Sequence, residues 1–328
     1  MTAVTAPRAG ELALATRGLV KRFGARTALA GLDLTVPAGV VYGFLGPNGA
    51  GKTTTMRLLT GLIHPDAGTI ELLGQPFRRG HRSLLFNVGA LIESPAFYPY
   101  LSGRANLRAL AATGSATPSR RVDEVLELVG LQERRRDKVS RYSLGMKQRL
   151  GIAAALLSDP QVLLLDEPAN GLDPAGIVAM RDTLRHLASI GKTVFVSSHL
   201  LPEIQQMADV VGIINQGRLV REGPIQELLS GQGRIRIRVG DDEVATAVAA
   251  VEALAGTGST AIQHEPTGAW ITVRTAPDRA SDVNRALATA GVYASALEAG
   301  TDLESLFLEL TGGRGEPSGP AGTMGGVA

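Results

Sequence analysis

The stretch GPNGAGKT, from Gly46 to Thr53, constrains this chain most, because it fits the phosphate-loop pattern G-x-x-x-x-G-K-[ST]. The apolar residues 40–45 before it predict a short buried strand, and residues 54–62 after it predict a helix. Glycines in such a loop let backbone N–H groups turn toward a phosphate chain, and the helix adds unpaired N–H groups and its positive dipole end. The alternative, a glycine-rich turn with a chance lysine, does not explain the strand and helix on either side.

Two side chains of this loop have predicted roles of their own. Lys52 is expected to reach the terminal phosphates of a nucleotide, and the Thr53 hydroxyl is expected to bind Mg²⁺. The predicted nucleotide-binding residues of the loop and the first helical turn are Gly46, Pro47, Asn48, Gly49, Ala50, Gly51, Lys52, Thr53 and Thr54.

Length and composition narrow the class of protein. A chain of 328 residues suggests one large or two ordinary domains, and a net charge of +2 gives no electrostatic footprint for nucleic acid. The absence of cysteine excludes disulfides and thiolate metal sites, which agrees with a reducing cytoplasm. We find no signal-peptide pattern and no apolar run near the ~18 residues of a membrane helix. We therefore expect a soluble chain that meets a membrane only through a partner.

A second group of polar residues follows two further apolar runs. Residues 162–165 are apolar on both faces, as in a central parallel strand, and they lead into Asp166 and Glu167. Ligands of open α/β sheets bind at the carboxyl ends of such strands, so we expect Asp166 to hold Mg²⁺ and Glu167 to polarise an attacking water. The alternative is two acids that begin a loop. His199 follows the strand predicted at residues 193–198, and this shared sheet edge favours a functional role over the structural role more common for a lone histidine.

Three other positions have two interpretations each on local sequence. Phe23 either stacks on an adenine base or fills a gap in the core. Ser143 has the position of a helix N-cap, which local sequence favours, but with the Gly145 N–H it also fits a second anion site. Glu93 ends a strand predicted at residues 88–92, and the aromatic, proline-rich loop after it either contacts another protein or packs on itself.

The character of the sequence changes after Gly231. A strand, a helix, two strands, a helix and a strand are predicted in that order, which suggests a small ferredoxin-like domain. The expected division is a flexible arm at residues 1–10, a nucleotide-binding domain at 11–230, an accessory α+β domain at 231–312 that closes with a helix at 302–310, and a disordered tail at 313–328. The predicted accessory elements are strands 234–239, 260–264, 269–273 and 292–296 and helices 243–254 and 279–290.

Taken together in this order and spacing, residues 12–229 resemble the nucleotide-binding subunit of an ABC transporter. Residues 46–53 are similar to its Walker A motif, 142–148 to its signature motif and 162–167 to its Walker B motif. Residues 170–173, which end at Asp173, are similar to its D-loop; His199 resembles its switch histidine and Phe23 its adenine-stacking aromatic.

The resemblance implies a P-loop NTPase core of α/β class, with an antiparallel β subdomain, a helical subdomain and a small α+β domain added at the C-terminus. It also implies ATP and Mg²⁺ as cofactors, with Glu167 as general base, His199 ordering the terminal phosphate and Asp173 near the nucleotide. Such subunits work in pairs, so Ser143 and Gly145 would act on the ATP held by a second copy. A polytopic permease would hold the pair at the cytoplasmic face of the membrane.

The chain departs from the family pattern in two places. Tyr142, Leu144 and Met146 replace the first, third and fifth residues of the common signature L-S-G-G-Q, while its serine and second glycine remain. Glu93 stands where most of the family has a glutamine that contacts Mg²⁺ and the permease, so Glu93 is a predicted metal ligand. An acidic residue there, followed by a pair like Phe97 and Tyr98, resembles drug-resistance and lantibiotic-immunity exporters.

The predicted function is an ATPase subunit that drives export of a drug, antibiotic or peptide through a separate permease, contacted near residues 93–100. An importer would share every catalytic residue. A soluble ABC-type ATPase acting on nucleic acid or the ribosome is a further alternative, although the chain has neither a long coiled-coil insertion nor a second cassette. A regulatory subunit that binds ATP without transport is the last alternative. No nucleic-acid partner is expected.

Overall fold

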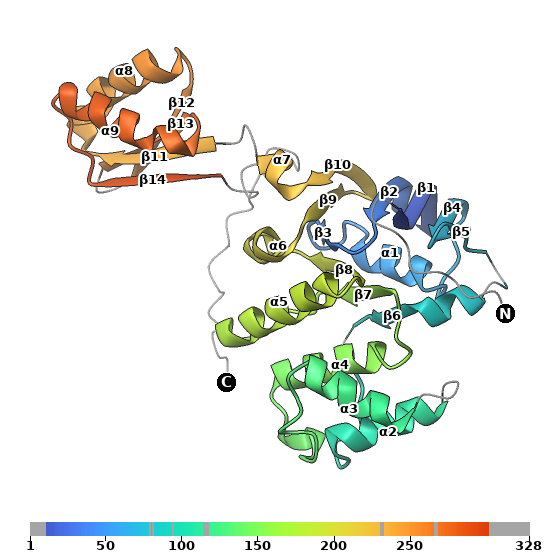
Figure 1. Cartoon of the computed structure of the whole chain (residues 1–328). Helices are drawn as coiled ribbons and strands as arrows, with labels where there is room; N and C mark the ends of the chain where they lie inside the picture. Colours follow the sequence, from blue (N-terminus) through green and yellow to red (C-terminus); the bar gives the residue numbers. More distant parts are fainter. Residues whose placement is uncertain are drawn as a thin grey trace, which may run out of the picture.

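The computed structural model describes residues 11–78, 80, 82–93, 95–113, 118–229, 233–265 and 268–301 (Figure 1). The predicted arm at residues 1–10, closing helix at 302–310 and tail at 313–328 lie outside this described part. No helix within it is long and apolar enough to cross a membrane.

A six-stranded sheet forms the centre of the larger part of the chain. Its strand order is β10-β9-β3-β8-β7-β6, and all neighbours are parallel except the antiparallel pair β9 and β10. A parallel sheet has both faces covered, and the predicted central strands are indeed buried along their length. The six strands are β3 (Val41–Leu45), β6 (Val88–Leu91), β7 (Val162–Asp166), β8 (Thr193–Ser198), β9 (Val210–Asn215) and β10 (Arg218–Pro224).

Each face of this sheet has its own apolar core, because alternate residues of a strand point to opposite faces. In β7, Val162 and Leu164 join the core on one face, while Leu163 and Leu165 join the core on the other. The first core includes the phosphate-loop helix α1 (Lys52–Leu59). The second core includes most of the remaining helices. The central sheet, with the carboxyl ends of its strands, therefore lies between two packed layers.

An antiparallel sheet packs beside α1 on the first face. Its strand order is β2-β1-β4-β5, and α1 contacts both β2 of this sheet and β7 of the central sheet. The long pair β1 and β2 has several register shifts, which bend and twist it. The strands are β1 (Leu12–Phe23), β2 (Arg26–Pro37), β4 (Ala67–Leu72) and β5 (Gln75–Pro76). This is the antiparallel subdomain that the family resemblance implied.

Helices form the layer on the other face. Three of them, α2, α3 and α4, contact one another and form a group at one side of the molecule (Figure 1), which is the implied helical subdomain. The helices of this part are α2 (Gly103–Thr113), α3 (Ser119–Leu128), α4 (Leu144–Ala155), α5 (Pro174–Ser189), α6 (Leu201–Met207) and α7 (Ile225–Leu229), with 3₁₀ turns η1 (Arg82–Asn87) and η2 (Val139–Arg141).

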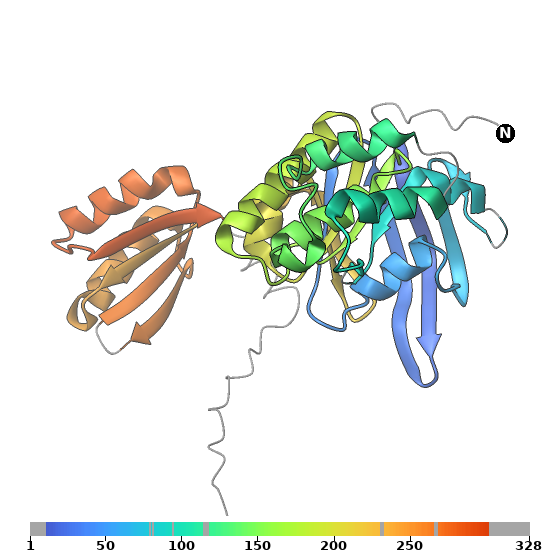
Figure 2. The same ribbon diagram turned by 90° about the horizontal axis from the view of Figure 1, so that it is seen from below.

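The last described part is a four-stranded antiparallel sheet with the strand order β12-β13-β11-β14 (Figure 2). Its apolar face packs on two helices, α8 and α9. The chain order is strand, helix, strand, strand, helix, strand. The elements are β11 (Gly233–Val239), η3 (Asp241–Glu243), α8 (Val244–Ala255), β12 (Thr260–Glu265), β13 (Gly268–Arg274), η4 (Pro277–Arg279), α9 (Ala280–Thr289) and β14 (Ala296–Thr301).

Two sequence predictions of elements need correction, and one helix was missed. The helix predicted at residues 54–62 is α1, which begins at Lys52 and ends at Leu59, because Gly61 has the positive φ that ends a helix. The strand predicted at 292–296 is β14, which begins only at Ala296, while Val292 is buried in the core before it. The helix α6 was not predicted, because its seven residues are too few for an apolar period to show.

Candidate functional site

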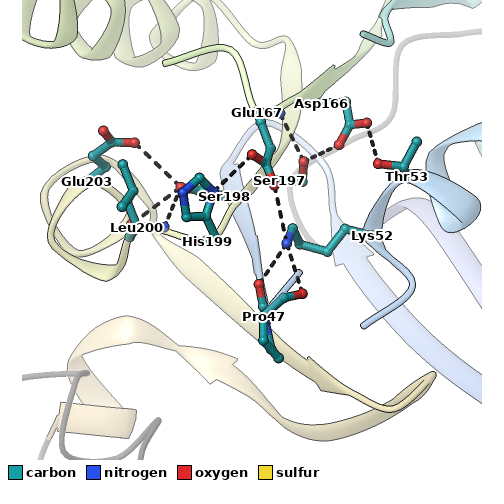
Figure 3. A network of polar contacts seen from close by, with 11 residues as sticks. Pro47, Lys52, Thr53, Asp166, Glu167, Ser197, Ser198, His199, Leu200 and Glu203 are labelled. Carbon is teal, nitrogen blue, oxygen red and sulfur yellow. Dashed lines mark hydrogen bonds and ion pairs between the residues drawn. The ribbon is translucent and has the colours of Figure 1, made fainter. Parts of the chain in front are cut away.

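The predicted polar residues meet at one edge of the central sheet. Because β3, β7 and β8 are parallel, their carboxyl ends lie together, and so do the loops that follow them. The loop after β3 leads into α1, which begins with Lys52 and Thr53. Strand β7 ends at Asp166, Glu167 follows it, and His199 follows β8. Figure 3 shows these five side chains directed toward one another.

The phosphate loop has its conformation because glycine occupies two crowded positions. Gly51 has a φ of 116°, and a Cβ there would lie 2.7 Å from Leu29 Cδ2 and 2.9 Å from the Ala28 carbonyl oxygen. A Cβ at Gly46 would lie 2.5 Å from the Ile214 carbonyl oxygen. Helix α1 follows with no side-chain cap on its first N–H groups. These N–H groups are therefore available to an anion.

Lys52 is a buried cation whose partners belong to the site. Its side chain is 5% exposed. Its Nζ donates to the carbonyl oxygens of Gly46 at 2.7 Å and Pro47 at 3.2 Å, and it lies 3.2 Å from Glu167 Oε1. A buried ammonium requires such compensation. The Lys52 amine therefore lies between the phosphate loop and the carboxylate of Glu167, the residue after β7.

Thr53 and Asp166 form one end of a hydrogen-bonded chain across the sheet edge. The Thr53 hydroxyl donates to Asp166 Oδ2 at 2.7 Å. The Ser197 hydroxyl donates to Asp166 Oδ1 at 2.5 Å and accepts from the Glu167 backbone N–H at 3.0 Å. Ser197 is fully buried in β8. This chain fixes the Asp166 carboxylate and the Glu167 backbone together.

Glu167 uses both carboxylate oxygens in the site. Oε1 faces Lys52, and Oε2 lies 2.9 Å from His199 Nδ1. Its φ of 46° is uncommon for a residue with a side chain, and such strain persists only where surrounding contacts enforce it. The structure thus places one carboxylate between an ammonium and an imidazole, which is the arrangement that a general base with a partner histidine needs.

The oxygen atoms present suit a magnesium ion that is shared with a nucleotide. The Thr53 hydroxyl and the Asp166 carboxylate lie within 2.7 Å of each other. No group of three or more His, Asp or Glu side chains that could hold a metal exists within the described residues. Magnesium is commonly held by one or two protein oxygens together with substrate phosphates and water. The donor set therefore fits a Mg²⁺–nucleotide complex better than a resident metal.

A cleft of about 380 Å³ opens beside these residues. Phe23 lines it and is 48% exposed, so it does not fill the core. The Lys21 amine lies 5.5 Å from the centre of the Phe23 ring. The lining residues are Phe23, Arg26, Ala28, Asn48, Gly49, Gly51, Lys52, Thr53, Thr54, Arg57 and Glu167.

Ser143, Gly145 and Asp173 are not among the residues that line this cleft. Ser143 is exposed and caps α4, accepting the Met146 N–H at 3.3 Å. Asp173 caps α5, accepting the Gly176 N–H at 3.0 Å. A single copy of the chain therefore keeps these three residues outside its own phosphate site, and the local contacts of Ser143 and Asp173 are those of ordinary helix caps.

Glu93 pairs with a cation that the sequence analysis did not single out. Its carboxylate forms an ion pair with Arg57, which lies in the last turn of α1 and lines the cleft. Glu93 has a φ of 67° and a side chain that is 63% exposed. In this structure the carboxylate is held by α1, and its contact with Mg²⁺ remains a prediction.

The aromatic loop after Glu93 divides into a packed and an open part. Phe97 packs against the helical core, whereas Tyr98 and Tyr100 are 56% and 64% exposed. Asn106 fixes the loop, since its side chain accepts the Tyr98 N–H and donates to the Tyr98 carbonyl oxygen. Phe97 therefore packs on the protein itself, and the contact of Tyr98 and Tyr100 with another protein stays a prediction.

Sequence reasoning missed three residues that the structure brings to this edge. Ser197 belongs to a strand that is mostly apolar, and its position near the end of that strand, just before His199, was the available signal. Arg57 reads as an ordinary surface residue of α1. Glu203 lies in the first turn of the unpredicted helix α6 and is 8% exposed, and burial raises the pKa of its carboxyl above the ordinary value.

Comparison with known proteins identifies the family. A sequence profile described as ABC transporter matches residues 29–170. The bacitracin transport ATP-binding protein BcrA of Enterococcus faecalis is 46% identical over 219 residues, 66% of this chain and 71% of the relative. The chain belongs to the ATP-binding proteins of ABC transporters. It is therefore an ATPase subunit of such a transporter, which implies a permease as partner.

Two other relatives extend this comparison. The daunorubicin resistance ATP-binding protein DrrA3 of Streptomyces coeruleorubidus is 40% identical over 308 residues, which are 92% of this chain and 96% of the relative. The lantibiotic transport ATP-binding protein SrtF of Streptococcus pyogenes is 40% identical over 209 residues, 64% of this chain and 90% of the relative.

Solved structures of the family share the fold of this ABC transporter ATPase. The structure of cbiO1 from Clostridium perfringens, part of the ABC transporter complex cbiONQ, matches with a TM-score of 0.62 at 26% identity. The match covers 67% of this chain and 91% of that one. The predicted fold class is confirmed, including the additional antiparallel sheet after the cassette.

Proposed function

We propose that this ABC transporter ATPase hydrolyses Mg²⁺–ATP at the edge formed by β3, β7 and β8, and that it powers export of an antibiotic, drug or peptide. The observation that carries the chemistry is Glu167, held between Lys52 at 3.2 Å and His199 at 2.9 Å. In this arrangement Glu167 accepts a proton from water, and His199 orients Glu167 and the terminal phosphate.

The other residues of the edge bind the nucleotide. Backbone N–H groups among residues 48–54 and the Lys52 amine neutralise the phosphates. Thr53 and Asp166 hold Mg²⁺, which lowers the charge on the phosphate oxygens when it is bound. The open face of Phe23, at the rim of the same cleft, stacks on the adenine.

A second copy of the chain completes each site. Ser143 and Gly145 lie outside the cleft that their own chain forms, and Ser143 is exposed at the N-terminus of α4. In a pair of subunits, this helix end adds N–H groups to the phosphates of the other subunit, with Asp173 close by. ATP binding then closes the pair and hydrolysis opens it.

The membrane partner binds the loop from Glu93 to Tyr100. Its exposed tyrosines supply aromatic area of the kind that protein interfaces use, and Glu93 is connected through Arg57 to the nucleotide cleft. The ATPase is thus held at the cytoplasmic face of the membrane. The domain division at residues 230 and 231 is part of the same proposal, with residues 231–312 as an accessory domain.

The exported compound is of the kind named for the relatives: bacitracin, daunorubicin or a lantibiotic. The daunorubicin relative supports this branch for 92% of the chain, so its similarity continues beyond residue 230. An importer remains the alternative with the same catalytic residues.

Affinity purification from native membranes in mild detergent, followed by mass spectrometry, tests the transport assignment. We expect a polytopic membrane protein in stoichiometric amount. Replacing Tyr98 and Tyr100 by serine should release it, whereas replacing Tyr293, which is 77% exposed in the C-terminal part, should not. Recovery of ribosomal or DNA-bound proteins alone would overturn the transport assignment and leave the ATPase intact.

Deletion of the gene in the native host tests the substrate class. We expect greater sensitivity to bacitracin, daunorubicin or a lantibiotic, and restoration by the wild-type chain but not by Glu167→Gln. Loss of uptake of a nutrient, with unchanged resistance to all three compounds, would support an importer instead.

A further inference from the structure

Glu203 is a buried carboxylic acid to which the proposed chemistry gives no role. It lies in the first turn of α6, four residues after His199, and is 8% exposed. Its Oε1 atom is buried and has no hydrogen-bond partner among the residues that the structure describes. Burying an ionisable group with an unpaired oxygen costs free energy, so the position calls for a compensating function.

The carboxylate reaches the turn that carries His199 through one hydroxyl group. The Ser198 Oγ atom lies 3.4 Å from Glu203 Oε2 and accepts the Leu200 backbone N–H at 2.9 Å. Leu200 is the N-cap of α6 and gives the helix no side-chain cap. In an ordinary capping box, a glutamate at this helical position accepts the N-cap N–H directly. Here Ser198 stands between the two groups.

This relay holds the residues on both sides of His199. Ser198 is buried at the end of β8, and its hydroxyl ties Leu200 to Glu203 (Figure 3). His199 lies between these two held residues, with its side chain 32% exposed and its Nδ1 at 2.9 Å from Glu167 Oε2. A fixed turn leaves the imidazole few orientations, and one of them reaches the carboxylate.

Charge connects the same groups. Burial raises the pKa of the Glu203 carboxyl, the Ser198 hydrogen bond and the charge of His199 act to lower it, and Glu167 raises it further. The three ionisable groups therefore share one electrostatic environment, although the structure gives no direct contact between Glu203 and the reacting atoms.

We propose that Glu203 is a positioning residue for ATP hydrolysis, which acts through Ser198 to hold His199 toward Glu167 and the terminal phosphate. The inference rests on the proposed function of Glu167 and His199. The carboxyl oxygen acts as a hydrogen-bond acceptor in this role, so an amide oxygen can replace it. The Ser198 hydroxyl also lies 3.4 Å from the Leu200 carbonyl oxygen, so a side chain without an acceptor at position 203 removes its only partner outside the turn among the described residues. The turn that carries His199 then loses its connection to α6 through Ser198.

The first experiment measures steady-state ATPase activity of the full chain, purified with its membrane partner. We expect Glu203→Ala to lower kcat about tenfold or more with KM for ATP within about twofold of the wild type, in line with partial loss of an acid–base contribution. Glu203→Gln should keep kcat within about threefold, since it retains the acceptor. Glu227→Ala is the matched control, because Glu227 is exposed in the first turn of the short helix α7.

The second experiment separates positioning from general loss of structure. In a His199→Ala background, Glu203→Ala should lower the residual kcat less than about twofold, because the residue that it positions is already absent. Ser198→Ala should behave in the same way. A further loss of tenfold in that background, or an effect confined to KM, would overturn the inference.

The outcomes also separate this inference from the proposed function. If Glu167→Gln is inactive while Glu203→Ala has wild-type kcat, the positioning role of Glu203 is wrong and the ATPase assignment stands. If Glu167→Gln hydrolyses ATP at the wild-type rate, the proposed chemistry itself is wrong.

Discussion

The central sheet and the C-terminal sheet make different use of buried strands. In β11 of the C-terminal sheet, buried and half-buried residues alternate along the whole strand, and none of the buried polar or charged side chains of the described residues lies in this sheet or its helices. In the central sheet, β7 is buried on both faces, ends at Asp166 and is followed by Glu167. The C-terminal sheet follows the regular alternation of a strand with one buried face. The central sheet departs from its apolar pattern at the strand ends, where the proposed chemistry takes place.

Backbone strain shows the same difference. Glu93 and Glu167, at the edge of the central sheet, have positive φ although neither is glycine. Within residues 233–265 and 268–301, the positive φ values all belong to glycines. Strained residues and a buried lysine cost stability, and they persist where they hold reacting groups in place. Glu167 is therefore a strained residue at the edge where the proposed reaction takes place, and the described residues of the C-terminal sheet have no such strain outside glycine.

The largest predicted effect is on turnover. Glu167→Gln keeps the shape of the side chain but removes its basicity, so kcat should fall by roughly 10² to 10⁴. The affinity for ATP should change little, because Lys52 and the loop N–H groups remain. Steady-state ATPase assays and fluorescent-nucleotide titration measure the two quantities. A kcat within a few fold of the wild type would mean that Glu167 is not the general base. The edge of the central sheet would then no longer differ from the C-terminal sheet in this respect.

The second prediction concerns the C-terminal sheet. Ile237 is fully buried in β11, so Ile237→Ala should lower the free energy of unfolding of this sheet by about 2 to 5 kcal/mol. Trp270 in β13 is the single tryptophan of the chain, and its fluorescence in urea reports this unfolding. Ile262→Ala, at a position that is 47% exposed, is the control and should cost less than about 1 kcal/mol.

The same variant sharpens the comparison if its ATPase activity is measured. The kcat of Ile237→Ala should equal that of the wild type at temperatures where the sheet is folded. A kcat that falls in proportion to the lost stability would show that the C-terminal sheet takes part in the reaction.

A smaller effect is expected at Glu93. Glu93→Gln removes the negative charge that faces Arg57, so the Mg²⁺ concentration for half-maximal ATPase activity should shift by about two- to fivefold, as suits a half-exposed pair. Arg57→Gln leaves the Glu93 carboxylate without its cation, so the Mg²⁺ concentration for half-maximal ATPase activity should shift in the opposite direction. An unchanged Mg²⁺ dependence in both variants would make the acidic group incidental.

The sequence was informative where a residue type and a spacing have one physical meaning. The Gly46–Thr53 loop, the acids after β7 and the alternation in β11 each predicted their local structure. The sequence could not show the partners that folding supplies from distant segments. Ser197 meets Asp166, and Arg57 meets Glu93, across 31 and 36 residues of chain. The boundaries of β14 and the existence of α6 were missed because short segments carry little periodicity.

The smallest predicted effect is a dependence of stability on pH at Glu203. Burial raises the pKa of this carboxyl above its ordinary value of 4.5, so above that pH the folded state keeps a proton that the unfolded state has lost. The free energy of unfolding therefore falls as pH rises through this range, and Glu203→Gln removes the fall. The variant should therefore gain stability relative to the wild type as the pH rises above about 4.5.

Thermal unfolding followed by circular dichroism measures this difference, and Glu227→Gln, the same substitution at an exposed position of α7, is the control. A relative stability of Glu203→Gln that stays constant with pH would mean that the buried carboxyl ionises as easily as an exposed one. In that case the edge of the central sheet would tolerate the Glu203 charge without cost. The contrast with the purely apolar core of the C-terminal sheet would then rest on Lys52, Asp166 and Glu167 alone.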